Sequence, residues 1–323
     1  MQNIATAFLL LLSIYKISCE TLKNECPEME KFPSCTCEKV LLHGLKFVCN
    51  EFLNIAYMKA ELRELDGKFN IYFLEIWNSV LNYLPTSLFR WVQMKQLKIF
   101  DSIIMGLEDE VANVPEEKLE RLTFNNTEGV DSWRWSSLSS LQNLWSIEIR
   151  NSDFSSVNGD FSLISPIKLA LIDLSNNNID FIDEYAFSPF KKLYDITLNN
   201  NKINKISRTM FPDPANFLKT LKISDNKIQT FPSDIFVNMP VLEEVVLNNN
   251  NVKILDMKTF LPLMNRKIKI RIENNDIYCC SYLSWMIENK SKIKFSGECK
   301  RPSHLSGKRI EKLTISEFDN ADC

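Results

Sequence analysis

The stretch Leu169-Ala-Leu-Ile172-Asp-Leu174-Ser-Asn-Asn177-Asn-Ile179 contains the pattern on which the chain is built. The same spacing of apolar residues returns three times before residue 261, and each copy places an asparagine at the same point. These asparagines recur at intervals of 24 or 25 residues, at Asn177, Asn201, Asn226, Asn250 and Asn275. A fixed period of this length indicates a stack of similar units, a solenoid, and not a globular domain around one central core.

Each unit is expected to begin with a short β-strand. Side chains alternate along a strand, so Ile172 and Leu174 point inward while Leu171 and Asp173 point outward. The chain then turns sharply, and the inward asparagine pairs with backbone groups that the turn leaves unbonded. Stacked units form a parallel sheet over one continuous core, which we predict to contain Ile179, Ile203, Ile228, Val252, Phe187, Phe211, Phe236 and Phe260.

The spacing Leu-x-x-Leu-x-Leu-x-x-Asn-x-Leu resembles the extracellular leucine-rich repeat family. This resemblance implies an α/β-type repeat solenoid, a horseshoe with a parallel β-sheet on its concave face. Chance recurrence of apolar residues and asparagines in some other β/α protein is the alternative. Five consecutive copies in phase argue against it.

The first half of the chain keeps the phase with a weaker pattern. Strand residues can be followed back through Ile147, Leu122, Leu97 and Leu74, which predicts about nine repeats in all. Hydroxyl residues stand where the asparagines stand later, and a hydroxyl group makes a similar but weaker local bond; they are Ser79, Ser102, Thr127 and Ser152. We expect the least regular stretch, residues 130–141 with Trp133 and Trp135, to bulge on the outer side.

The chain opens with an apolar run, residues 4–15, that is too short to span a bilayer and suits a secretory signal peptide. An uncleaved anchor is the alternative. The expected organisation is a signal peptide (1–19), a cysteine-rich N-terminal cap (20–65), the repeats (66–273) and a cysteine-rich C-terminal cap (274–323). We therefore expect a secreted, extracellular protein with no membrane span.

The cysteines fall into two groups at the ends of the repeats. Of nine, eight remain after loss of Cys19, four before residue 50 and four after residue 278. In a secreted chain this grouping favours two disulfide caps, which would cover the open ends of the sheet. Zinc is the competing interpretation, but the spacing lacks the paired Cys-x-x-Cys of common zinc modules.

The resemblance to leucine-rich repeat proteins extends to both caps. Cys26-Pro27, Cys35-Thr-Cys37 and Val48-Cys49 are similar to the N-terminal flank of that family, which implies the disulfides Cys26–Cys37 and Cys35–Cys49. Leu283-Ser-Trp285 and the stretch from Cys299 to Gly307 are similar to the C-terminal flank. The implied pairs there are Cys279–Cys299 and Cys280–Cys323.

Several classes of function have no support in the sequence. The balance of 38 basic and 41 acidic residues gives no electrostatic case for a nucleic-acid partner. With two histidines and every mature cysteine assigned to a disulfide, no catalytic arrangement is visible, and no phosphate loop or metal motif occurs. We expect no enzyme activity, no cofactor and no metal.

The remaining candidate for function is the outward-facing wall of the strands. Aromatic and arginine side chains are enriched at binding hot spots, and both cluster on the first four predicted strands. We predict a contact centred on Phe73, Trp77, Lys98, Phe100, Arg121, Glu148 and Arg150. The alternative is that the aromatic residues only cover the sheet, beneath the N-terminal cap.

Two sequons, Asn125-Asn-Thr127 and Asn289-Lys-Ser291, are candidate glycosylation sites in a secreted chain. Asn289 lies in the C-terminal cap. Asn125 lies on the predicted concave wall, so a glycan on it would restrict the contact to its aromatic end.

The whole arrangement resembles a narrower family, that of the non-catalytic subunit of oplophorus-luciferin 2-monooxygenase and its arthropod relatives. The motifs that carry this resemblance are Cys26-Pro27, Phe32-Pro-Ser-Cys-Thr-Cys37, Ile76-Trp77-Asn78-Ser79 and the four-cysteine C-terminal end. We predict a non-catalytic protein that binds another protein or a surface ligand through its concave face. The alternative is an accessory subunit that stabilises a secreted enzyme.

Overall fold

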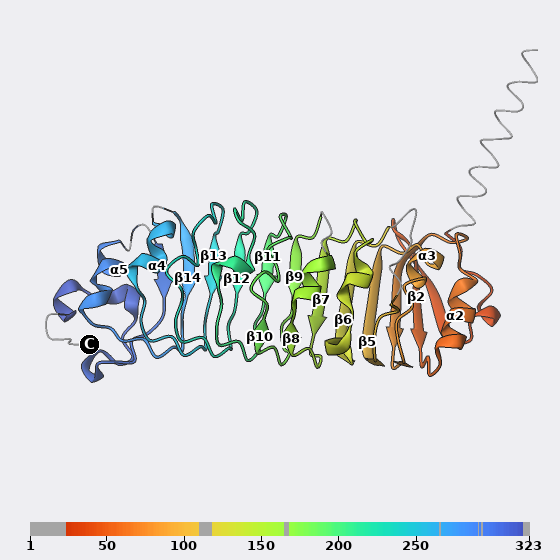
Figure 1. The fold of residues 1–323 in the computed structure, drawn as a ribbon, viewed down its shortest axis with the longest axis horizontal. Coiled ribbons are helices and arrows are strands. Elements are labelled where there is room, and N and C mark those ends of the chain that lie inside the picture. Colours follow the sequence, from red (N-terminus) through yellow and green to blue (C-terminus); the bar gives the residue numbers. More distant parts are fainter. Residues whose placement is uncertain are drawn as a thin grey trace, which may run out of the picture.

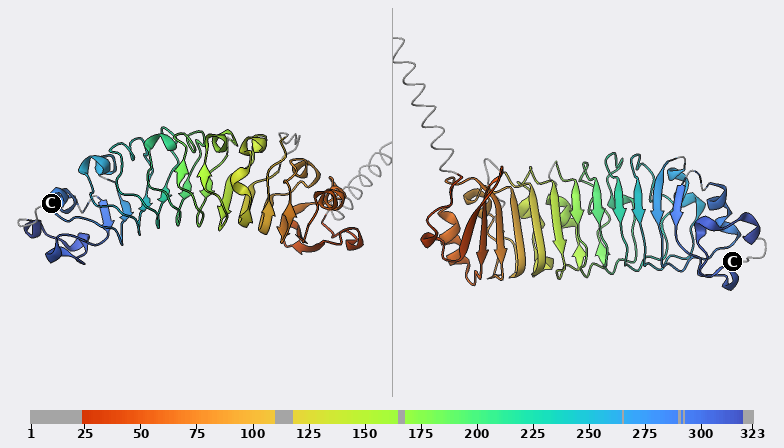
Figure 2. Two further views of the ribbon diagram at one scale, coloured as in Figure 1. Left: turned by 60° about the horizontal axis from the view of Figure 1, so that its bottom comes forward. Right: turned by 180° about the vertical axis from the view of Figure 1, so that it is seen from behind.

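The computed structural model describes residues 24–109, 118–164, 168–264, 266–289, 291 and 293–318. The expected signal peptide and Cys323 lie outside these residues. Within the described residues, thirteen strands form one sheet that runs the length of the molecule (Figure 1). The strands line the inner side of a curved arc, while short helices and turns form its outer side (Figure 2). The predicted leucine-rich repeat horseshoe is thereby confirmed.

Nine parallel strands of the described chain correspond to the expected repeats. They are β3 (Ile71–Trp77), β5 (Gln96–Ile104), β6 (Arg121–Glu128), β7 (Ser146–Arg150), β9 (Leu171–Asp173), β11 (Asp195–Thr197), β12 (Thr220–Lys222), β13 (Glu244–Val246) and β14 (Ile268–Arg271). The other strands of the sheet are β1 (Cys35–Val40), β2 (Gly44–Asn50), β4 (Val80–Leu81) and β15 (Ile293–Ser296). A separate parallel pair joins β8 (Ser156–Val157) to β10 (Phe181–Ile182).

The helices are short, as expected where each unit only has to return the chain to the next strand. The α-helices are α2 (Ile55–Arg63), α3 (Leu88–Trp91), α4 (Met257–Phe260) and α5 (Ser284–Glu288). The 3-10 helices are η1 (Met29–Lys31), η2 (Val130–Ser132), η3 (Trp135–Leu138), η4 (Gly159–Ile164), η5 (Arg208–Met210), η6 (Leu261–Leu263), η7 (Ser281–Leu283), η8 (Ser303–Leu305), η9 (Ile310–Lys312) and η10 (Ile315–Phe318).

A buried asparagine after each late strand joins neighbouring units. The side-chain amide of Asn177 donates to the carbonyl oxygens of Ile149 (2.7 Å) and Leu174 (2.9 Å), and its oxygen accepts from the amide of Ser152 (2.9 Å). Asn201, Asn226, Asn250 and Asn275 donate in the same way one unit further on each time, and their oxygens accept from the amide two residues after the preceding asparagine, that of Ile179, Ile203, Ile228 and Val252. These bonds satisfy backbone groups that would otherwise be buried without partners.

In the first four units a hydroxyl group takes the place of the asparagine amide and makes fewer of these hydrogen bonds. The hydroxyl of Ser102 accepts from the backbone amide of Ser79 at 3.0 Å, and that of Ser152 accepts from Thr127 at 3.1 Å. Each serine then donates only within its own turn, to Phe100 (2.6 Å) and Arg150 (2.9 Å) respectively. A serine has one donor where an asparagine amide has two, so the early units are joined by fewer bonds.

The predicted core residues are buried, and aromatic side chains connect the core along the arc. Phe187, Phe211, Phe236 and Phe260 are each at most 1% exposed. In the stretch 130–141, where we expected a bulge on the outer side, η2 and η3 form, and Trp133 and Trp135 are buried in the core at 3% and 1% exposed. Trp133 donates to the carbonyl of Ile104 at 2.8 Å, and Trp135 packs on Phe161 with ring centroids 5.3 Å apart.

Both caps extend the sheet, the N-terminal cap by two strands and the C-terminal cap by one. β2 pairs in parallel with β3 and antiparallel with β1, and β15 pairs in parallel with β14. Disulfides join Cys26 to Cys37, Cys35 to Cys49 and Cys279 to Cys299, the pairs implied by the family resemblance. Cys280 is also disulfide-bonded, and its expected partner Cys323 lies outside the described residues.

We expect Asn177→Ala to lower the free energy of unfolding by about 2–4 kcal/mol, because it leaves buried backbone groups of two units unpaired. The adjacent Asn178 is exposed, and Asn178→Ala is the matched control with an expected change below about 0.5 kcal/mol. Urea unfolding of both variants measures the difference. Equal losses would show that the buried amide does not hold the units together.

Candidate functional site

The pairing register places the predicted contact residues on four neighbouring strands. Phe73, Gln96 and Arg121 lie side by side at the start of β3, β5 and β6. Two further rows run parallel to this one across the strands; they are Glu75, Lys98, Thr123, Glu148 and Trp77, Phe100, Asn125, Arg150. All seven predicted residues therefore lie in one continuous area. We call Phe73, Trp77, Lys98, Phe100, Arg121, Glu148 and Arg150 the concave patch.

The aromatic side chains of the concave patch are half-buried, and those on β3 adjoin the cap strand β2. Trp77 and Phe100 stack with ring centroids 4.1 Å apart and planes inclined by 23°. The ammonium group of Lys98 lies 4.8 Å from the ring centroid of Phe73. The indole nitrogen of Trp77 has no hydrogen-bond partner among the described residues. Stacked rings offer a flat apolar surface at little entropic cost, because each ring is already held by its neighbour.

The charged end is a chain of ion pairs between strands. Glu148 is 8% exposed and contacts two guanidinium groups, that of Arg121 at 4.0 Å and that of Arg150 more closely. Arg150 also lies 2.9 Å from the carboxylate of Asp173 on β9. These contacts hold both arginines in position before any ligand arrives, which lowers the entropic cost of binding through them.

The same alternation occurs at the aromatic end. The carboxylate of Glu75 lies between the ammonium groups of Lys46 (3.4 Å) and Lys98 (3.5 Å), which come from the cap and from β5. Each acidic group is flanked by basic ones, so the basic side chains of the concave patch are held in ion pairs while basic groups stay in excess there. Its side chains offer oriented hydrogen-bond donors and aromatic surface.

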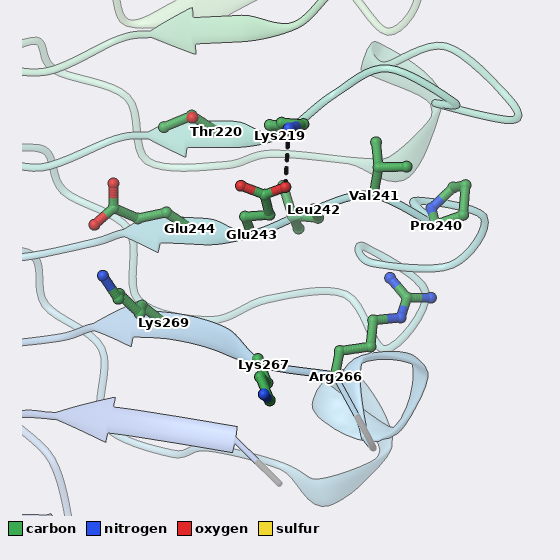
Figure 3. Close-up of a pocket in the computed structure, with 10 residues that line it drawn as sticks. All are labelled: Lys219, Thr220, Pro240, Val241, Leu242, Glu243, Glu244, Arg266, Lys267 and Lys269. Carbon is green, nitrogen blue, oxygen red and sulfur yellow. Dashed lines mark ion pairs between the residues drawn. The ribbon is translucent and has the colours of Figure 1, made fainter.

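Sequence reasoning missed a second surface, at the edge of the sheet where the strands begin. Two hollows lie there, one of about 680 Å³ beside Trp145, Tyr194 and Phe217 and one of about 760 Å³ beside Lys219 and Lys267. Figure 3 shows the second, with Lys219, Glu243 and Lys267 at the strand starts. The signal in the sequence is the Leu-x-x-Leu spacing, which places two consecutive side chains outside the core where a strand begins, such as Tyr194 and Asp195 between Leu193 and Ile196. Strict alternation accounts for only one of them.

The two sequons differ in their surroundings. Asn125 is half-buried on β6, and its side-chain oxygen accepts from Asn151 at 2.6 Å. Thr127 of the same sequon is fully buried. Asn289 follows α5, where its amide donates to the carbonyl of Trp285 at 2.8 Å.

The described residues contain no cluster of three or more histidine, cysteine or acidic side chains placed to hold a metal ion. The two histidines lie apart from one another. His43 packs on Tyr72 with ring centroids 4.6 Å apart, and His304 lies in η8 of the C-terminal cap. Among the same residues, no helix is long and apolar enough to cross a membrane.

These features define a leucine-rich repeat fold with disulfide-bonded cysteines near both ends of the described chain. The family model for leucine-rich repeats matches residues 167–216 and 217–267, the most regular part of the sequence. No curated protein matches the chain in sequence. The expected resemblance to the luciferase subunit has no support from this comparison.

Solved structures share the fold at low sequence identity. One is the leucine-rich repeat protein FLRT2, in an octameric complex with Latrophilin 3 and Unc5D; it has 17% identity, a TM-score of 0.62 and coverage of 92% of this chain and all of that chain. Another is human 5T4, also called Wnt-activated inhibitory factor 1 or trophoblast glycoprotein, with 14% identity, a TM-score of 0.58 and coverage of 93% and 100%. Likeness at this identity is likeness of fold.

We expect Glu148→Ala to destabilise the protein by about 1–3 kcal/mol, because it leaves two arginines of like charge facing each other. The matched control is Glu243→Ala, whose side chain is 63% exposed and paired with one partner, Lys219; its midpoint of urea unfolding should not change measurably. An equal shift in both variants would mean that burial of Glu148 between two arginines adds nothing to the free energy of unfolding beyond an exposed ion pair.

Proposed function

We propose that this chain is an extracellular, non-catalytic protein that binds another protein through the concave patch. The observation that carries the proposal is the half-buried Trp77–Phe100 stack beside arginines that are already held by ion pairs. Rigid aromatic groups next to oriented arginines are the side chains that dominate binding energy at protein interfaces. The curved sheet surrounds such a contact with further polar side chains.

Two further observations support this proposal. Disulfides persist in oxidising compartments, and the chain has them near both ends of the described residues. FLRT2, which shares the fold, was solved in a complex with other proteins. An extracellular location and a protein ligand agree with both.

Affinity capture from the extracellular fluid of the source organism tests the proposal. The bait is residues 20–323, compared with a Trp77→Ala, Phe100→Ala variant. We expect the captured protein to bind the variant at least about thirtyfold more weakly, because two hot-spot side chains are lost.

The matched control removes two exposed aromatic side chains outside the sheet, by Phe181→Ala and Tyr185→Ala. It should capture as well as the parent. All three proteins must keep the same melting temperature and disulfides. Equal capture by the two double variants would move the site away from the concave patch. Recovery of an enzyme at fixed stoichiometry would favour the accessory-subunit alternative.

We also propose that Asn125 and Asn289 carry N-linked glycans. Enzymatic deglycosylation followed by peptide mass spectrometry should find each asparagine converted to aspartate. A glycan on Asn125 would stand beside Phe100, its neighbour in the sheet, and would limit the concave patch to its aromatic end. Unmodified asparagine in the secreted protein would remove this restriction.

A further inference from the structure

Three aromatic side chains gather where the strands begin, in the first hollow at the edge of the sheet. Trp145 precedes β7, Tyr194 precedes β11 and Phe217 lies just before β12. Tyr194 and Phe217 are 47% and 44% exposed, and the half-buried Ala170 and Leu171 lie between them and Trp145. Clustered large apolar side chains with this exposure are uncommon on a soluble surface unless they bind something.

Each aromatic ring already has a cation over one face. Arg121 lies 4.3 Å from the ring centroid of Trp145, Lys192 lies 4.1 Å from that of Phe217, and Lys219 lies 5.5 Å from that of Tyr194. Cation–π contact holds these basic groups at the rim of the apolar surface. The hollow therefore has an apolar centre with positive charge around it.

The second hollow continues the first along the same edge and is more basic. Lys219 belongs to its lining and also lies over Tyr194, so the two hollows meet at β12. Lys219 forms an ion pair with Glu243 at 3.0 Å, and this hydrogen bond raises the pKa of the lysine. Lys267 and Lys269 are exposed and have no acidic partner within the described part of the chain (Figure 3).

The charge of this surface differs in sign from that of the protein. The two hollows together are lined by six basic and three acidic side chains, whereas the whole chain has a net charge of −3. We call this surface, from Trp145 to Lys269 along the strand starts, the edge groove. A local surplus of positive charge on an acidic protein attracts an acidic partner.

We propose that the edge groove binds an extended acidic segment of a protein partner, with an aromatic or aliphatic side chain of that segment placed against Trp145, Tyr194 and Phe217. Its carboxylates would then face Lys192, Lys267 and Lys269. This inference rests on the proposed function only in that the ligand is a protein, since the surface lies beside the concave patch and not within it.

The geometry favours a peptide over a sulfated glycan. A sugar ring stacks flat on an open aromatic face, and here one face of each ring is taken by a cation of the protein itself. A peptide side chain can instead insert at the ring edges while its carboxylates reach the lysines. The groove crosses the starts of six strands, which at about 4.8 Å per strand is about 24 Å. An extended segment of about seven residues covers that length.

Selection from a random nine-residue peptide library on residues 20–323 tests the proposal. We expect the enriched peptides to combine acidic residues with an aromatic or large aliphatic one. A synthetic copy of an enriched peptide should bind at least tenfold more weakly to each of two double variants. One is Lys192→Glu, Lys267→Glu and the other is Tyr194→Ala, Phe217→Ala. Because Lys192 and Lys267 are exposed, the charge-reversed variant should keep the parent's melting temperature.

The matched control, Lys202→Glu, Lys227→Glu, reverses two exposed lysines that follow the buried asparagine turns, and it should bind like the parent. The concave-patch variant Trp77→Ala, Phe100→Ala should also bind the peptide like the parent, so the two proposals fail separately. Enrichment of peptides without acidic residues, or of none, would overturn the proposal. Loss of peptide binding in the concave-patch variant alone would also overturn it. The same holds if no peptide binds and a heparin-derived oligosaccharide binds in a way that depends on Lys192 and Lys267.

Discussion

The structure depends on the pairing of backbone groups at one sharp turn. After each strand the chain leaves the sheet, and the amides and carbonyls at that turn are too deep for water to reach. The buried asparagine supplies an acceptor and two donors to them, and it reaches the neighbouring unit as well as its own. Because each of the later units is bonded to the one before it through its asparagine, the next strand is held in register with the last.

Register is what turns a repeating scaffold into a binding surface. Side chains at equivalent positions of successive strands lie about 4.8 Å apart, so a pair separated by a whole repeat in sequence becomes a direct contact. Trp77 and Phe100 stack for this reason, and Arg121 of β6 reaches Glu148 of β7 for the same reason, whereas Arg150 meets Glu148 along one strand. A slip of one residue in any strand would turn these side chains into the core.

The repeat, the register, the buried asparagines and the serines that replace them could all be predicted from the sequence, because each follows from a fixed period along the chain. The side-chain contacts between neighbouring strands could not be predicted in this way. The ion pair between Lys46 of the cap and Glu75 forms because β2 joins the sheet. The cap strand is not part of the repeat, so the repeat period does not predict this pairing. Trp133 and Trp135 interrupt the pattern, yet they are buried, because a large aromatic side chain can fill the space that the regular apolar residues leave. The edge groove could not be predicted from alternation, because two consecutive side chains lie outside the core at a strand start, such as Tyr194 and Asp195, where strict alternation places one.

Arg121 connects the two surfaces. One side of its guanidinium group lies over Trp145 at the edge groove, and the group also reaches Glu148 within the concave patch. The position of Arg121 is therefore fixed by Trp145 at the edge groove and by Glu148 in the concave patch. Replacing either residue would change how firmly Arg121 is held at the other surface. Arginine suits this place because its planar group stacks on a ring and donates to a carboxylate at the same time, which a lysine ammonium group cannot do with the same geometry. The aromatic end of the concave patch and the basic end of the edge groove lack such a shared residue, so each can be altered without disturbing the other.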